Sequence, residues 1–185
     1  MSEKKTKKVN DFFMYKNDIL CVEDVSIINI TNNIKTPFYV YSTASLRRRY
    51  TDLATSLKNI KHSLYFSVKS NSNLAVLRVL SLLGSGMDVV SGGEYLRAQK
   101  AGVPGYKVVF SGVGKTYDEI KLALIGGIRQ FNVESIPEII MINKIASSLG
   151  KKAPISIRVN PDVDAQTHKK IMTGTSENKF GIPLN

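Results

Sequence analysis

Five short apolar runs recur along most of the chain, and a helical pattern separates each from the next. The runs are 63–69, 86–91, 107–112, 129–135 and 154–160, and the helical patterns are 73–83, 92–101, 116–125 and 136–149. The runs end about 20 to 25 residues apart, the spacing of a βα unit that returns through a helix to a parallel neighbour. We therefore predict an α/β fold with a parallel sheet, either doubly wound or a (β/α)8 barrel.

The predicted strands are rich in Val, Phe and Ile, which indicates strands buried on both faces. In both candidate folds, functional side chains gather at the C-terminal ends of the strands. Polar residues stand near the ends of all five runs: Lys69, Asp88, Ser91, Ser111, Asn132, Glu134, Arg158 and Asn160. Packing does not require this matched placement, so we predict a site at that edge of the sheet.

The first 62 residues are less regular. Residues 1–10 contain four lysines and are predicted to form a disordered basic tail, and residues 11–35 to form short strands and turns. Residues 36–42 follow as a predicted strand, and a helix begins near Thr43 with Ser42 or Thr43 as its N-cap. Residues 36–185 are predicted to form one α/β domain that contains the parallel sheet.

Composition narrows the classes of protein. With 185 residues, of which 43% are hydrophobic, the chain can bury a core, and no run approaches the ~18 apolar residues of a membrane span. The single Cys21 cannot form an internal disulfide, which agrees with a cytoplasmic location. The net charge of +11 suggests a basic binding module as an alternative, but no nucleic-acid-binding or zinc motif accompanies it. We expect no nucleic acid, membrane or metal partner.

One phosphate-binding motif is excluded. The stretch "FSGVGKT", residues 110–116, follows a predicted strand and opens a predicted helix, where a P-loop would lie. A P-loop requires a glycine five residues before Gly114, and that position is Val109. The chain is therefore not predicted to be an NTPase.

Lys69 ends an apolar strand, which is unusual for an ammonium group. Such a lysine extends its charged end to solvent, pairs with a carboxylate, or acts as a nucleophile. Its position alone leaves these three explanations open.

The surrounding residues resemble a known family. The stretch "YFSVKSNSNLAVLRVLSLLGSGMDVVSGGEYLRAQKAGVP" is similar to the fold-type III decarboxylases that use pyridoxal 5'-phosphate (PLP). Further along, "RVNPDVDAQTH" and "ENKFGI" resemble the diaminopimelate decarboxylase branch rather than the ornithine or arginine branch. The resemblance covers about residues 36 to 182.

The resemblance implies specific residue roles. Lys69 would form the Schiff base with PLP, and Asp88 and Arg158 would lie near the cofactor, with a structural ion pair at the barrel mouth as the alternative. His168 would lie in a loop that closes over the substrate, with a plain exposed loop as the alternative.

The implied reaction removes CO2 from meso-2,6-diaminopimelate, a small amino acid, and yields L-lysine, the last step of lysine biosynthesis. The implied fold is an alanine racemase-like (β/α)8 barrel, of which about five parallel strands are present. The rest of the barrel and a C-terminal β domain would be absent, so we expect the 185-residue chain to be inactive alone and the full-length protein to be a homodimer. A non-catalytic PLP-binding barrel and an ornithine- or arginine-type decarboxylase are the alternatives.

Overall fold

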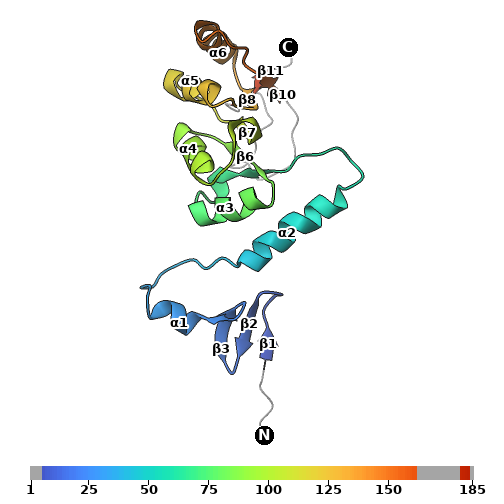
Figure 1. Cartoon of the computed structure of the whole chain (residues 1–185), viewed down its shortest axis with the longest axis vertical. Helices are drawn as coiled ribbons and strands as arrows, with labels where there is room; N and C mark the ends of the chain where they lie inside the picture. Colours follow the sequence, from blue (N-terminus) through green and yellow to red (C-terminus); the bar gives the residue numbers. More distant parts are fainter. Residues whose placement is uncertain (1–5, 162–179, 184–185) are drawn as a thin grey trace. The chain divides into compact units, whose positions relative to one another are not determined.

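The computed structural model describes residues 6–161 and 180–183 of the chain. The chain forms two compact units, Met1–His62 and Ser63–Asn185 (Figure 1). The division falls after His62, so the helix that begins at Thr43 belongs to the first unit, whereas the sequence predicted a boundary at residue 36.

The first unit contains a four-stranded antiparallel sheet in the order β1-β2-β3-β4, and two helices. Its elements are β1 (Thr6–Lys8), β2 (Phe13–Lys16), β3 (Ile19–Val22), β4 (Val25–Ser26), α1 (Ile27–Thr31) and α2 (Thr43–Ser56). Asn17 and Asp18 have φ values of 51° and 61°, the left-handed pair of a two-residue hairpin turn. Strand β1 pairs with β2, so the prediction of a disordered tail was wrong for Thr6–Lys8.

Glu23 joins the end of this sheet to the start of α2. Its Oε1 accepts hydrogen bonds from the Ser42 hydroxyl at 2.7 Å and from the Ala44 N–H at 3.0 Å. These bonds, that of Ala44 first, hold the pKa of Glu23 below its ordinary value. Ser42 in turn accepts from the Ser45 N–H, which confirms it as the N-cap.

Two predictions for this unit were wrong. Residues 36–42 form no strand, and Tyr39 is 90% exposed. An extended apolar run becomes a strand only where a neighbour pairs with its backbone, and the described residues offer none here. Helix α1 was also missed; Ser26 begins it by accepting from the Asn29 N–H.

The second unit alternates strands and helices, as predicted. Its elements are β5 (Tyr65–Ser67), the 3₁₀ turn η1 (Val68–Ser70), α3 (Leu74–Leu82), β6 (Gly86–Val89), α4 (Gly92–Lys100), the 3₁₀ turn η2 (Gly105–Lys107), β7 (Val108–Phe110), α5 (Tyr117–Ile125), β8 (Gln130–Val133), α6 (Ile136–Ser148), β9 (Ile155–Ile157), β10 (Val159–Asn160) and β11 (Ile182–Pro183).

The order of the parallel strands decides between the two candidate folds. The five strands pair in sequence order, β5-β6-β7-β8-β9, and Figure 1 shows α3 to α6 along one side of them. A doubly wound sheet reverses its order and carries helices on both faces, whereas a barrel advances strand by strand with its helices outside. The described sheet is therefore an open part of a (β/α)8 barrel.

The two faces of this sheet differ in chemistry. The face toward the helices is apolar, and Met87, Val89, Phe110 and Phe131 on it are fully buried. Alternate residues point to the other face, which carries half-buried polar side chains: Ser67, Asp88, Ser111 and Asn132. The prediction of strands apolar on both faces was wrong, because only the helix side packs against a core. The polar face is the one that a closed barrel encloses.

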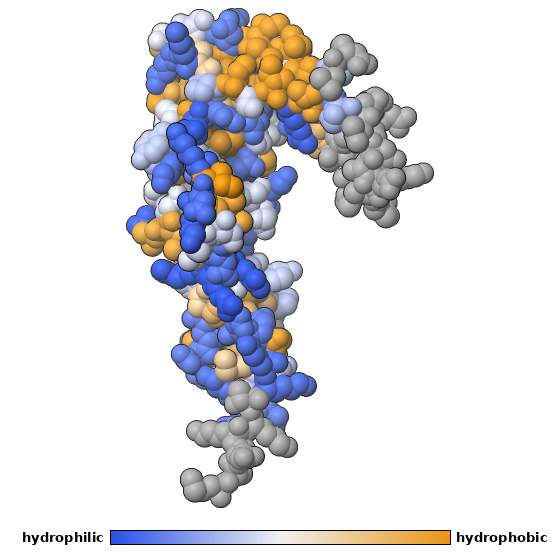
Figure 2. All heavy atoms as spheres, turned by 90° about the vertical axis from the view of Figure 1, so that its right-hand side faces the viewer, coloured by the Kyte–Doolittle hydropathy of each residue, from blue (hydrophilic) through white to orange (hydrophobic). Residues whose placement is uncertain are grey.

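The last strand leaves apolar side chains uncovered. Ile155 and Ile157 of β9 are 41% and 54% exposed, and Ile140 of α6 is 64% exposed. Figure 2 shows hydrophobic side chains gathered at the end of this unit that carries α6. Exposed strand edges and apolar patches favour pairing between chains.

We expect the 185-residue chain by itself to associate at micromolar concentration, measured by sedimentation velocity. Ile155→Lys should reduce this association, because a lysine on an exposed edge strand opposes edge-to-edge pairing. Ile60→Lys changes a residue that is 63% exposed in the first unit and should have no such effect. A monodisperse monomer would contradict the prediction.

Candidate active site

Lys69 lies on a firmly held turn at the C-terminal end of β5. Val68, before it, is fully buried, and the Ser70 hydroxyl after it donates to the Ser67 carbonyl oxygen at 2.7 Å. Lys69 itself is exposed, and none of the ion pairs among the described residues includes it. The turn therefore presents a primary amine at the edge where the sequence predicted a site.

A row of hydrogen bonds crosses the polar face beside this turn. The Ser111 hydroxyl donates to Asp88 Oδ1 at 2.5 Å, and the Asn132 amide donates to Ser111 Oγ at 2.9 Å. The Gln130 amide continues the row to Asn132 Oδ1 at 2.8 Å. In the register of β5 and β6, Asp88 stands directly opposite Ser67, and Ser67 precedes Lys69 by two residues. The structure therefore brings Asp88 to the strand next to the one that carries the lysine.

Arg158 belongs to a different cluster. Its Nη1 lies 3.1 Å from Oε1 of Glu134, whose side chain is only 3% exposed, while the Arg158 side chain is 41% exposed. Among the described residues, Arg158 pairs with Glu134, whereas Asp88 bonds to Ser111, so Glu134 supplies the carboxylate of the ion pair at this edge. A hollow of about 320 Å³ lies between the two clusters, lined by Ser111, Asn132, Glu134, Ser156, Ile157 and Arg158.

Lys115 forms a buried ion pair that sequence reasoning missed. Its Nζ lies 2.6 Å from Oε1 of Glu138 and donates to the carbonyl oxygens of Gly112 and Asn132, both at 2.8 Å. The two side chains are 1% and 7% exposed. All three ammonium protons can thus be satisfied, which a buried lysine requires. The lysine of the excluded "GKT" motif therefore joins the loop before α5 to β8 and α6.

Glutamates at the third position of three successive helices hold the loops between strands and helices. Glu94 accepts from the Val90 N–H at 2.8 Å, and Glu138 accepts from the Glu134 N–H at 3.0 Å. Each glutamate stands three residues after a Ser or Thr N-cap, a pattern typical of capping boxes. These pairs are readable in the sequence, but their links to neighbouring loops are not.

Glu119 makes the longest-range of these caps. It accepts from the Thr116 N–H at 2.9 Å and, with its other oxygen, from the Gly92 N–H at 2.7 Å. Burial raises the pKa of Glu119, but the bonds from Gly92 and Thr116 outweigh burial and hold the pKa below its ordinary value. A Cβ on Gly92 would lie 2.9 Å from Glu119 Cγ, so the contact requires a glycine.

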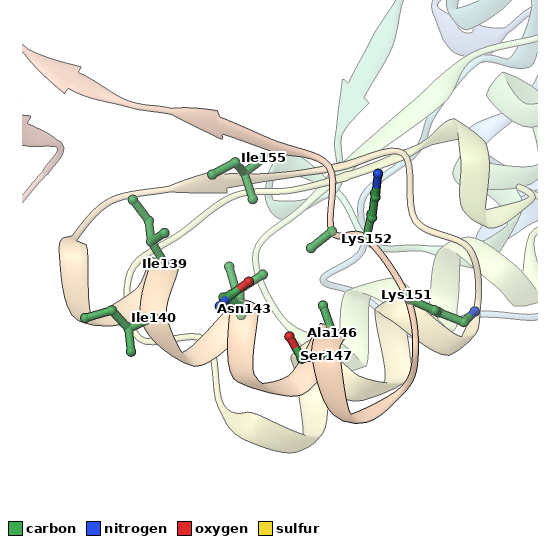
Figure 3. Close-up of a pocket in the computed structure, with 10 residues that line it drawn as sticks. Ile139, Ile140, Asn143, Ala146, Ser147, Lys151, Lys152 and Ile155 are labelled. Atoms are coloured by element: carbon green, nitrogen blue, oxygen red, sulfur yellow. The ribbon is translucent and has the colours of Figure 1, made fainter.

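A second hollow, of about 610 Å³, lies between α6 and β9 (Figure 3). Its lining includes Ile139, Ile142 and Ile155, and the Lys151 ammonium beside it donates to the Leu124 carbonyl oxygen at 2.9 Å. Ile155 is on the helix-facing side, opposite Phe131 in the register. This hollow therefore belongs to the uncovered outer face and not to the polar face.

Other predicted features can be placed only in part. His168 lies outside the described residues. No group of His, Cys, Asp and Glu side chains that could hold a metal ion occurs among the described residues. Within residues 6–161 and 180–183, no helix is long and apolar enough to cross a membrane.

Comparison with known proteins shows the family to which the chain belongs. The model of the pyridoxal-dependent decarboxylase family, pyridoxal binding domain, matches residues 43–185. The chain belongs to this family. Two curated members similar to it are the diaminopimelate decarboxylases of Pseudomonas aeruginosa, 50% identical over 175 residues, and Vibrio cholerae, 51% identical over 176 residues.

Solved structures of the family share the fold. Diaminopimelate decarboxylase from M. jannaschii in complex with L-lysine is 38% identical with a TM-score of 0.85, and covers 95% of this chain. The Helicobacter pylori enzyme with L-lysine is 46% identical with a TM-score of 0.80, and covers 85% of this chain. The match spans 42% of the M. jannaschii chain and 40% of the H. pylori chain, and 42% of each curated relative named above.

For the buried pair, we expect Lys115→Met to lower the free energy of unfolding of the complete protein by about 3 to 5 kcal/mol, because it leaves the Glu138 carboxylate buried without its cation. Urea denaturation measures this loss. Lys121→Met, on the exposed side of α5, should stay within about 0.5 kcal/mol. The double variant Lys115→Met/Glu138→Gln should be more stable than Lys115→Met, and a double variant equally unstable would contradict the explanation.

Proposed function

We propose that the complete protein decarboxylates meso-2,6-diaminopimelate to L-lysine and CO2 with PLP as its cofactor, and that this chain supplies part of the barrel that holds the cofactor. The observation that carries the proposal is the exposed amine of Lys69 on a fixed turn, beside Asp88, at the C-terminal edge of a family-typical sheet. Family membership supports the cofactor, and the names of the relatives support the substrate.

The residues present fit the cofactor. A Schiff base with PLP needs an accessible primary amine, and Lys69 offers one at the edge where barrel enzymes bind their ligands. The row of hydroxyl and amide groups on the polar face offers further hydrogen-bond donors and acceptors. PLP, when bound, draws electrons from the substrate carbon that loses CO2.

The chain's own residues then have distinct tasks. Lys69 would hold the cofactor through its primary amine, and the same amine, when free, would supply the proton that replaces the lost carboxylate on the substrate carbon. The Ser111 hydroxyl fixes the orientation of the Asp88 carboxylate, which faces the same region from the next strand. Arg158 lies at the far side of the hollow, held by Glu134.

The choice of substrate follows from the relatives. Proteins about 50% identical to this chain are named diaminopimelate decarboxylases, and the M. jannaschii and Helicobacter pylori structures are complexes with L-lysine, the product of that reaction. Homodimer formation and a cytoplasmic location stay predictions.

The complete protein, loaded with PLP, should release CO2 and L-lysine in equal amounts from meso-diaminopimelate. Ornithine and arginine should react with kcat/KM values at least about a hundredfold lower, because a site that pairs with a substrate's polar groups rejects analogues that lack them. Amino-acid chromatography with CO2 detection checks this. A preference for ornithine or arginine would show a different decarboxylase, and stoichiometric PLP binding without turnover would show a non-catalytic PLP protein.

Borohydride reduction of the PLP-loaded complete protein should place the pyridoxyl mass on the peptide that contains Lys69, as read by peptide mapping. Lys69→Arg should abolish the label even though it keeps the charge, because a guanidinium does not form this link at neutral pH. Lys121→Met, on the exposed side of α5, removes a lysine without disturbing a buried pair and should leave the labelled peptide unchanged. A label confined to another lysine would contradict the assignment.

A further inference from the structure

Glu134 is a buried carboxylate at the end of β8 that gathers three separate parts of the chain. Its side chain is 3% exposed. Arg158 Nη1 lies 3.1 Å from its Oε1 and 3.3 Å from its Oε2, and the Gly181 N–H donates to Oε2 at 3.1 Å. Its own backbone N–H donates to Glu138 at 3.0 Å. This carboxylate thus joins β8 to the segment that carries Arg158 and to the segment 180–183.

Arg158 is fixed on one side and open on the other. Its guanidinium carbon lies 4.8 Å from the centre of the Phe180 ring, and its backbone N–H donates to the Val133 carbonyl oxygen at 2.9 Å. The side chain is nevertheless 41% exposed and lines the hollow of about 320 Å³. Glu134 and Phe180 together restrict where the guanidinium can point within that hollow.

The backbone around Gly181 is shaped for this contact. Val159 and Asn160 pair in parallel with Ile182 and Pro183, and the Ile182 N–H donates to the Arg158 carbonyl oxygen at 2.8 Å. Gly181 has φ of +81°, and a Cβ there would lie 2.9 Å from the Asn160 nitrogen. Only a glycine allows this approach, so the backbone bond to Glu134 is built into the local structure.

We propose that Glu134 is a positioning residue for the decarboxylase site: it holds the Arg158 guanidinium in the wall of the hollow and docks residues 180–183 beside it. This role rests on the proposed function, because it acts on the reaction only through Arg158. Glu134 also lines the hollow, but its two side-chain oxygens are buried and already accept from Arg158 and Gly181, so we assign it the task of holding these groups. A carboxylate is suited to the task because its two oxygens accept from a cation and a backbone N–H together.

The first test removes the charge and keeps the shape. In the complete PLP-loaded protein, Glu134→Gln places an amide donor opposite donors, so kcat/KM should fall about tenfold or more, an activation free-energy change of about 1.4 kcal/mol. Arg158→Lys should cause a similar loss, because an ammonium lacks the planar fork of the guanidinium. If the two residues act together, the double variant should be little worse than either single variant. If the loss of kcat/KM in the double variant equals the product of the two single losses, the residues act independently and the proposed coupling is wrong.

The second test measures directly whether Glu134 docks residues 180–183, and it does not depend on enzyme activity. Hydrogen–deuterium exchange of the peptide that contains Gly181 and Ile182 should be about tenfold faster in Glu134→Gln, while the peptide that contains Phe131 should be unchanged. Asp118→Asn, on the exposed start of α5, is the matched control and should alter neither. Unchanged exchange at Gly181 would overturn the docking role.

A third variant covers the case in which Glu134→Gln does not fold. Phe180→Leu removes the ring beneath the guanidinium and keeps an apolar side chain, so it should lower kcat/KM less than Arg158→Lys and leave Gly181 exchange nearly unchanged. If Phe180→Leu has the same kcat/KM as the parent protein, the claim that the Phe180 ring helps to hold Arg158 for the reaction is wrong. If the complete protein has no decarboxylase activity, the proposed function fails, and the exchange measurement still decides whether Glu134 docks residues 180–183.

Discussion

The parallel register of β5 to β9 is the constraint on which the site depends. Because the strands run parallel and pair in sequence order, all their C-terminal ends meet at one edge, and α3 to α6 lie along one side of the sheet (Figure 1). Side chains far apart in the chain then become neighbours: Ser111 lies 23 residues from Asp88, and Asn132 lies 21 residues from Ser111. Lys69 joins this edge only because β5 is the strand next to β6.

Glutamates at the starts of the helices hold this edge in place. Glu119 caps its own helix and also accepts from Gly92 at the start of α4, while Lys115, just before α5, reaches forward to Glu138 on α6. Each loop is thereby tied to a neighbouring loop as well as to its own helix. A buried charge costs several kcal/mol unless its partners are all present, so a loop held in this way has few alternative conformations. A site that must orient a reacting bond benefits from such rigidity.

The sequence predicted what depends on local pattern. Helix periodicity and strand spacing identified the five parallel strands and the helices between them. Residue type narrowed the N-cap of the first long helix to Ser42 or Thr43, and the structure shows that it is Ser42. Prediction from the sequence failed where strand formation depends on a pairing neighbour. Residues 6–8 form a strand because β2 pairs with them, and residues 36–42 form none because no described strand pairs with them. Glu134 could be placed at a strand end, but its bond to Gly181, 47 residues away, depends on the folded register.

Charge is distributed unevenly along the edge, and this suggests a division of tasks. Toward β8 to β11, Glu134 and Arg158 neutralise each other and hold the backbone of Gly181. Toward β5 and β6, Asp88 accepts its hydrogen bond from a neutral hydroxyl. Lys69 forms no ion pair within the described part of the chain, so neither side chain has a partner of opposite charge there. Charges paired within the protein stabilise structure, whereas charges left with neutral partners can respond to a ligand. The proposed chemistry at Lys69 therefore lies where the fold leaves charge uncompensated, and the rigid pairs lie two strands or more away.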